Sequence, residues 1–281
     1  MRSVISAIAT LFAAACASRT EPAPAPAPLE PRVEYLQSED GAQIQAHVFD
    51  PGPSARPRAA IIVFHGGGWA YGDPTLAYPR ARRYAERGMG AIAAQYRLSN
   101  QADITPLESM ADARAQIRWA RANAERLNID RARIAAYGWS AGGQLVVTAA
   151  ELGDAASRPD AMVLLSPSLA PERDGWFANL IGARGAPEDY SPLRQVRPGM
   201  APSLILQGDV DTETPLAHAQ EFCAEMQAVG SLCELGVYEG FGHLFTPAGQ
   251  DDRGAPNPDG ATAAIAAERA DLFVREQRFI E

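Results

Sequence analysis

The stretch Gly138–Gly143 reads Gly-Trp-Ser-Ala-Gly-Gly and stands between a predicted strand, Arg133–Tyr137, and a predicted helix, Ala141–Ala150. A turn this tight needs glycines on both sides of the central serine, because a Cβ there would clash. The serine is then held in a strained backbone with its hydroxyl exposed. The following helix points its N-terminus at the reacting centre, where negative charge develops. The stretch therefore predicts that Ser140 is a nucleophile.

Around this turn, apolar runs of strand length alternate with helical patterns along the rest of the chain. The predicted strands are Val33–Leu36, Ile44–Phe49, Ala60–Phe64, Ala91–Tyr96, Arg133–Tyr137, Ala161–Leu165, Ser203–Gln207 and Leu232–Tyr238. The predicted helices are Ala77–Arg87, Ser109–Arg126, Ala141–Ala150, Pro215–Val229 and Ala261–Phe279. This alternation is typical of a mainly parallel central sheet with helices on both faces, so we expect an α/β fold.

These elements occupy residues 32–281 of a chain of 281 residues, 47% of them hydrophobic, which is enough for one large domain. The stretch Ser166–Pro202 has no clear periodicity and follows a strand, at the edge of the sheet where ligands bind in such folds. We expect it to be a small cap or pocket wall. Trp176 and Phe177 either line the pocket or pack in the interior.

The N-terminus has the features of an export signal in residues 1–17. Arg2 is followed by a short apolar run, Val4–Ala15, and Ala15-Cys16-Ala17 satisfies the small-x-small rule for cleavage. The residues up to Cys16 also resemble a bacterial lipobox, so lipidation of Cys16, with attachment to a membrane, competes with plain secretion. Residues 18–31 form a Pro/Ala-rich linker. We expect an exported protein, either a periplasmic or outer-membrane lipoprotein or a secreted one.

Charge and cysteine content add two expectations. The chain has 25 basic and 34 acidic residues, a net charge of −9, which argues against nucleic acid as a partner because phosphate binding needs clustered cations. Apart from Cys16, the cysteines are Cys223 and Cys233, at the end of one predicted helix and the start of the next strand. They form either a disulfide, as an oxidising compartment allows, or two buried thiols.

A glycine-rich loop, His65–Trp69, reads His-Gly-Gly-Gly-Trp directly after a predicted buried strand. Three glycines let the backbone approach a substrate oxygen closely. Their N–H groups can donate to a tetrahedral oxyanion together with the N–H of Ala141. A phosphate-binding loop of the Walker type would need Gly-Lys-Ser/Thr, which is absent.

Elimination among the four histidines selects the base. His47 lies in the first predicted hairpin, His218 inside a helix and His65 in the glycine loop. His243 lies in a loop after the last predicted strand, where a general base can reach the nucleophile. Its neutral imidazole can take the Ser140 proton and return it to the leaving group.

The acid that orients His243 has two candidates. Asp209 and Asp211 both follow the Ser203–Gln207 strand, and either could fix the imidazole tautomer. The residues themselves leave this choice open, and the carboxylate that does not serve is expected to make a local turn hydrogen bond. With either one, the order serine, acid, histidine is that of the α/β-hydrolases.

Residues from about Ile61 to Phe245 resemble the hormone-sensitive-lipase and bacterial feruloyl/acetyl esterase-like branch of the α/β-hydrolases. The resemblance is carried by four segments: His65–Trp69, Tyr96–Leu98, Asn128–Ile134 and Gly138–Gly143. It implies an α/β-hydrolase fold. The short stretch before Ala60 departs from the larger lipase-like members and implies a minimal cap.

The same resemblance refines the site. Its Gly-x-x-Asp pattern, followed shortly by Pro, selects Asp211, and its loop pattern assigns Gly67 and Gly68 as oxyanion donors with Ala141.

We therefore expect a serine carboxylic ester hydrolase with a catalytic Ser140–His243–Asp211 triad and an acyl-enzyme intermediate. The expected substrate is a small-molecule ester with a short acyl group, or an aryl or acetyl ester of a carbohydrate, on the resemblance and the export signal. No cofactor and no metal are expected, because no His/Cys cluster has ligand spacing. An amide or peptide hydrolase on the same fold, or a non-catalytic binding protein, are the alternatives.

Overall fold

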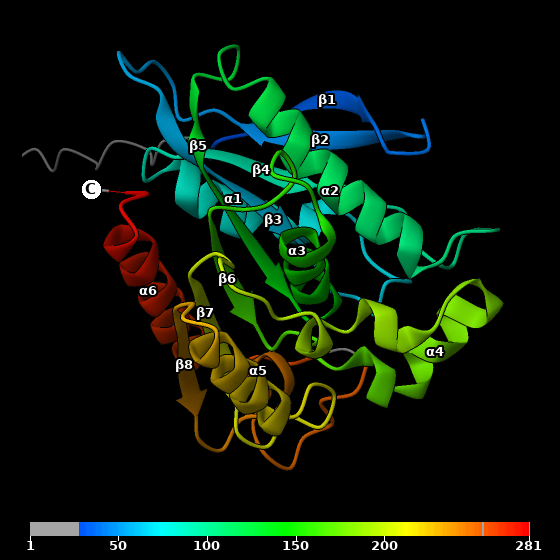
Figure 1. The fold of residues 1–281 in the computed structure, drawn as a ribbon. Coiled ribbons are helices and arrows are strands. Elements are labelled where there is room, and N and C mark those ends of the chain that lie inside the picture. The colour runs from blue at the N-terminus through cyan, green and yellow to red at the C-terminus, as the bar shows by residue number, and fades with distance from the viewer. Residues whose placement is uncertain (1–27, 255, 281) are drawn as a thin grey trace, which may run out of the picture.

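The computed structural model describes residues 28–254 and 256–280, in which eight strands form a single sheet with helices on both faces (Figure 1). The strands are β1 (Arg32–Gln37), β2 (Gln43–Phe49), β3 (Arg58–Phe64), β4 (Gly90–Ala94), β5 (Ile129–Trp139), β6 (Ala161–Leu165), β7 (Ser203–Gly208) and β8 (Cys233–Tyr238). The helices are α1 (Tyr78–Ala85), α2 (Pro106–Ala122), α3 (Ala141–Leu152), α4 (Gly175–Ile181), α5 (Leu216–Ala228) and α6 (Gly260–Glu276). Short 3-10 helices lie at Pro74–Ala77, Pro171–Arg173, Gly182–Arg184, Pro187–Tyr190, Pro192–Arg194 and His243–Phe245.

The strand order is β1-β2-β4-β3-β5-β6-β7-β8. β2 runs antiparallel to both β1 and β4, and the pairs from β4 through β8 are parallel. The mainly parallel sheet predicted from the alternating pattern is therefore confirmed. The predicted signal at residues 1–17, with Cys16, lies outside the described residues, as does most of the 18–31 linker. No helix in the described ranges combines the length and the apolar character needed to cross a bilayer.

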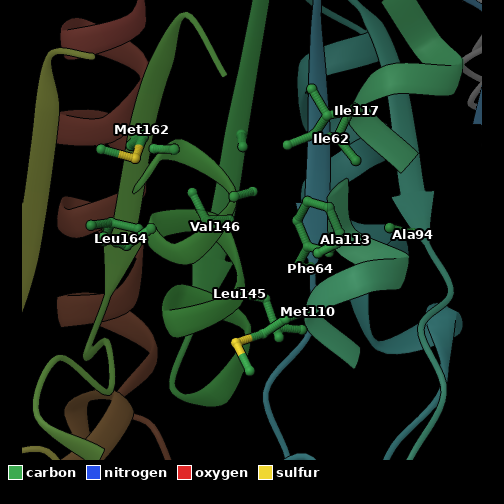
Figure 2. Close-up of a cluster of buried hydrophobic side chains, with 14 of the residues drawn as sticks. Ile62, Phe64, Ala94, Met110, Ala113, Ile117, Leu145, Val146, Met162 and Leu164 are labelled. Carbon is green, nitrogen blue, oxygen red and sulfur yellow. The ribbon is translucent and has the colours of Figure 1, made fainter. Parts of the chain in front are cut away.

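The core has two layers because the central strands are buried on both faces. In β3, Ile62 and Phe64 face α2 and α3, while Ile61 and Val63 face the layer that contains residues of α1 and α6. Figure 2 shows the first layer, where Phe64 lies close to side chains of α2 and α3. Strands buried on both faces have near-continuous apolar sequences, which explains why Arg58–Phe64 has no polar alternation.

Helix α2 begins three residues before the predicted start at Ser109. Thr105 accepts a hydrogen bond from the N–H of Leu107, the Glu108 carboxylate accepts one from the N–H of Thr105, and Pro106 occupies the first turn. This capping box ends the preceding loop at Thr105. The helix also ends earlier than predicted, at Ala122, where Asn123 leaves helical geometry.

The stretch Ser166–Pro202 contains α4 and several single-turn 3-10 helices, too short for a periodic signal. In Figure 1, α4 lies beyond the ends of the strands toward which the arrows point. Of the two aromatic residues singled out there, Trp176 is 42% exposed. Phe177 is fully buried, with its ring edge-on to Trp69 at 4.8 Å between centroids, so it is a core residue and not a pocket-lining one.

The sequence left open whether Cys223 and Cys233 pair or remain as buried thiols. Cys223 of α5 and Cys233 of β8 form a disulfide, with a Cα–Cα distance of 5.2 Å. The bridge connects α5 to the strand that follows it.

Glu151, in the last turn of α3, is a buried carboxyl group without compensation. Neither of its carboxyl oxygens has a hydrogen-bond partner in the described structure, and only 6% of the residue is exposed. Burial raises the pKa of Glu151 well above its ordinary 4.5, although the charge of Arg197 opposes the rise. Between pH 4.5 and this raised pKa, Glu151 therefore keeps a proton in the folded protein that it releases in the unfolded chain.

Because this pKa is raised on folding, the contribution of Glu151 to stability is complete at low pH and is lost as the pH rises above 4.5 toward the folded-state pKa. We expect Glu151→Gln to gain stability relative to wild type between pH 5 and pH 8. Urea unfolding at both pH values measures this difference. Glu221→Gln is the control. The ion pair with Arg173 lowers the pKa of Glu221, so burial does not hold a proton on this carboxylate in the folded protein. An equal difference at both pH values would contradict the prediction.

Candidate active site

Ser140 stands alone between the end of β5 and the start of α3, with φ 53° and ψ −124°. A non-glycine residue in such a conformation is strained by about 1–3 kcal/mol. The surrounding chain leaves no room to relax. A Cβ on Gly138 would lie 2.2 Å from the carbonyl oxygen of Gly142, and a Cβ on Gly142 would lie 2.4 Å from those of Phe64 and His65. The glycines are therefore required by close approach.

Three of the predicted site residues meet at this turn. The Ser140 hydroxyl lies 3.0 Å from His243 Nε2, and His243 Nδ1 lies 3.0 Å from Asp211 Oδ2. The serine precedes α3, the acid lies in the loop after β7, and the histidine lies in the loop after β8. These are the distances at which a base can take a proton from a nucleophile while a carboxylate orients the base.

Asp211 is held by donors on both of its oxygens. Its Oδ2 accepts hydrogen bonds from Gln207 Nε2 at 2.8 Å and Thr214 Oγ1 at 2.9 Å. Its Oδ1 accepts from the backbone N–H groups of Glu213 at 3.0 Å and Thr214 at 2.7 Å. A buried carboxylate with this many donors is fixed in one orientation.

Asp209 has a different position. Its exposed side chain accepts a hydrogen bond from the N–H of Gly240 at 2.7 Å. The expectation of a local turn bond was therefore wrong, because the partner lies 31 residues away and the bond connects the acid loop to the histidine loop. The structure brings Asp211, and not Asp209, to His243.

Gly67, Gly68 and Ala141 line the same pocket as Ser140, with a volume of about 610 Å³. Gly67 and Gly68 have φ values of 122° and 56°, which favour glycine. Their carbonyls are engaged: Gly67 O accepts from the N–H of Tyr71 at 2.9 Å, and Gly68 O accepts from Trp176 Nε1 at 2.9 Å. Ala141 is the first residue of α3, where backbone N–H groups have no acceptor within the helix.

His65 is buried beneath the surface and contacts the backbone of the glycine loop. It is 1% exposed, its Nδ1 lies 2.6 Å from the carbonyl oxygen of Gly66, and its ring stacks on Tyr96. The Tyr96 hydroxyl donates to the His65 carbonyl at 2.8 Å. Burial lowers the pKa of His65, which favours the neutral ring. The segment Tyr96–Leu98 thus contributes to the site through the loop that it supports.

Asp252 is a further residue of the site that its sequence did not reveal. Its Oδ2 accepts hydrogen bonds from the backbone N–H groups of His243 and Thr212, both at 3.0 Å, and its Oδ1 accepts from Thr212 Oγ1 at 2.6 Å. Partial burial raises the pKa of Asp252, but these hydrogen bonds outweigh it and lower the pKa overall. One carboxylate therefore joins the histidine loop to the acid loop.

The pocket around Ser140 opens between aromatic and aliphatic walls. Trp176 and Tyr71 lie with nearly parallel rings, 12° apart in orientation and 6.5 Å between centroids, and both are exposed at the mouth. A polar groove of about 340 Å³ adjoins this pocket and shares Glu213 and Thr214 with it. Across residues 28–254 and 256–280, no group of three His, Cys, Asp or Glu residues is placed to hold a metal ion.

Known proteins are similar to this chain in sequence and in fold. Residues 47–164 match the protein family described as BD-FAE. The apo form of Thermogutta terrifontis esterase 2 is 30% identical, with a TM-score of 0.79 over 91% of this chain and 98% of that one. The chain belongs to the α/β-hydrolase superfamily, in its hormone-sensitive-lipase-like branch of carboxylesterase-type hydrolases.

Curated relatives of this α/β-hydrolase agree with that membership. Esterase LipC of Mycobacterium tuberculosis is 28% identical over 243 residues, and Carboxylesterase NlhH of the same species is 33% identical over 111 residues. The chain spans 60% of the length of the first and 34% of the length of the second. The predicted family and fold class are confirmed.

We expect Asp252→Ala to lower kcat for p-nitrophenyl acetate by roughly ten- to a hundredfold, with KM little changed, because His243 loses the acceptor that positions its backbone. Steady-state kinetics of the purified variant measure this. Asp251→Ala is the matched control, since among the described residues the exposed Asp251 side chain accepts a hydrogen bond only from the N–H of Arg253. Equal activities of the two variants would contradict the prediction.

Proposed function

We propose that this α/β-hydrolase is a serine carboxylesterase that works through a Ser140–His243–Asp211 triad. The observation that supports this most directly is the pair of 3.0 Å contacts that link Ser140 Oγ to His243 Nε2 and His243 Nδ1 to Asp211 Oδ2. His243 Nε2 takes the Ser140 proton while Ser140 Oγ forms a bond to the ester carbonyl carbon. Asp211 stabilises the imidazolium that results.

The tetrahedral intermediate places a negative charge on the former carbonyl oxygen. The N–H groups of Gly67, Gly68 and Ala141 are its proposed donors, and each is worth about 3–4 kcal/mol of transition-state stabilisation. The carbon–oxygen bond to the alcohol then breaks, and His243 gives its proton to the leaving oxygen. Water, deprotonated by His243, then attacks the acyl carbon of the acyl-Ser140 ester. The bond from that carbon to Ser140 Oγ breaks, His243 returns its proton to Ser140 Oγ, and the acid is released.

The proposed substrates are esters of small acyl or aryl groups, including esters of polyhydroxylated alcohols such as carbohydrates. The Trp176–Tyr71 pair at the mouth offers aromatic faces to a flat or sugar-like ring. The adjoining polar groove offers Arg173, Glu213 and His218 to hydroxyl groups. Solved structures of Thermogutta terrifontis esterase 2 hold propionate and butyrate, which supports short acyl groups as candidates here.

We expect Ser140→Ala to lower the hydrolysis of p-nitrophenyl acetate by about 10⁵–10⁶-fold with the fold intact, because no other group replaces the nucleophile. Undiminished turnover by the purified variant would refute the mechanism.

Asp211→Asn and Asp209→Asn form a matched pair. The first should lose about 10⁴-fold through the wrong imidazole tautomer, and the second should retain activity. Faster turnover of an aminoacyl anilide than of the ester would favour an amide hydrolase.

We also propose that the protein is exported and anchored through lipidated Cys16. The Cys223–Cys233 disulfide supports an oxidising compartment, where such bridges persist. In a bacterial host, palmitate labelling should mark the wild-type protein and not Cys16→Ser, which should leave the membrane fraction. An unlabelled wild-type protein would contradict the anchor, and its recovery from the periplasm or medium would indicate plain secretion.

A further inference from the structure

A second groove, of about 580 Å³, leads away from Ser140 between α1 and α6. It shares Leu76, Trp139, Leu244 and Pro256 with the pocket around Ser140, so the two hollows are adjacent and the Trp139 ring lines both. The side of the groove formed by α6 has only small side chains, all of them alanines. The site therefore opens into two grooves of opposite character, one polar and one largely apolar.

Arg80 lies in the apolar groove, and its charge has no counter-ion in the part of the chain that the structure describes. Its guanidinium lies 4.4 Å from the ring centroid of Trp139 and 5.6 Å from that of Tyr137, and its Nε donates to the Tyr137 hydroxyl at 3.3 Å. Among the residues that the structure describes, neither Nη1 nor Nη2 of Arg80 has a hydrogen-bond acceptor, and no carboxylate forms an ion pair with it. Neither nitrogen is among the buried atoms without a partner, so both are accessible from outside the protein.

The other cation of the groove differs. Arg83 donates to both carboxylate oxygens of Asp271, at 3.1 and 2.6 Å, and its charge is neutralised there. No Asp or Glu belongs to the described residues that line the groove. The positive charge of Arg80 in this apolar surrounding is therefore not balanced by any carboxylate of residues 28–254 and 256–280.

A guanidinium whose plane is fixed by two aromatic rings presents a rigid pair of donors, which fits a carboxylate. The stacking on Trp139 also places this charge beside the residue that precedes the nucleophile. An anion bound to Arg80 would thus be connected to Ser140 by the apolar part of the groove.

On the proposed esterase function, the polar groove suits the alcohol half of an ester, and the apolar groove is left for the acyl half. We propose that the apolar groove binds acyl groups with a carboxylate at their far end, and that Arg80 pairs with that carboxylate. The preferred substrates are then monoesters of dicarboxylic acids. The hydrolytic step is unchanged: the distal carboxylate is neither formed nor consumed, and the products are the alcohol and the free diacid.

The test compares p-nitrophenyl monoesters of adipic and suberic acid with p-nitrophenyl hexanoate and octanoate, their neutral counterparts of equal chain length. For wild type, kcat/KM should be higher for at least one monoester than for its counterpart. Arg80→Gln should lower kcat/KM for the monoesters by about ten- to a hundredfold, the value of a charged hydrogen bond, and leave the neutral esters unchanged. Arg80→Lys, which keeps the charge, should recover part of the loss.

Arg56→Gln is the matched control, because it removes the same charge from an exposed loop outside the groove. If Arg56→Gln and Arg80→Gln acted equally, overall charge and not a subsite would explain the preference. An equal loss on charged and neutral esters, or no preference in wild type, would overturn the proposal.

A second comparison tests which half of the ester, acyl or alcohol, carries the carboxylate that pairs with Arg80. The butyrate ester of 6-hydroxyhexanoate carries its carboxylate on the alcohol half, and hexyl butyrate is its neutral counterpart. If the enzyme preferred the charged ester of this pair in a way that depends on Arg80, and showed no preference for the monoesters, the carboxylate would bind on the alcohol side and the acyl assignment would be overturned. Turnover of p-nitrophenyl hexanoate reports the proposed function separately. Its absence would refute the esterase, whereas its presence without a carboxylate preference would refute only the subsite.

Discussion

The contact on which the site depends is the one between the start of α3 and the end of β3. At Gly142 the helix lies so close to the carbonyl oxygens of Phe64 and His65 that a side-chain carbon would come within 2.4 Å of either. This approach brings Ser140, which follows β5, and the glycine loop, which follows β3, together at the carboxyl ends of these two adjacent parallel strands. Every residue with a proposed role at the oxyanion follows from it, because Gly67 and Gly68 continue from His65 while Ala141 begins the helix.

A second constraint holds His243 and Asp211, the proposed base and acid, together. The loops after β7 and β8 are joined at three points: by Asp211 to His243, by Asp252 to both loops, and by Asp209 to Gly240. The bonds from Asp211 to His243, from Thr212 to Asp252 and from Gly240 to Asp209 each cross from one loop to the other, whereas the bond from His243 N–H to Asp252 lies within the loop after β8. Because β7 and β8 are adjacent parallel strands, the two loops start at the same edge of the sheet, and three short polar side chains are enough to connect them.

The sequence was sufficient where local chemistry is strong. The glycine spacing around Ser140 and the small number of histidines predicted two residues that the structure brings together, and the alternation of strands and helices predicted the sheet. Asp211 needed a family pattern, since Asp209 has the same chemistry two residues away. Asp252 had no local signal, because its role exists only once two distant loops meet. Thr105 did have one, the Thr-Pro-Leu-Glu capping box, which a search for apolar periodicity overlooks.

The positive φ of Ser140 has one more consequence. The conformation is imposed by β3, by α3 and by the carbonyls of Leu165 and Ser166, which both accept a hydrogen bond from the Ser140 N–H. These groups come from three separate regions of the chain. In an unfolded polypeptide Ser140 is an ordinary seryl hydroxyl in relaxed backbone, no more reactive than any other. The reactivity proposed for Ser140 therefore depends on tertiary structure, and a nascent or denatured chain is expected to lack it until the sheet is complete.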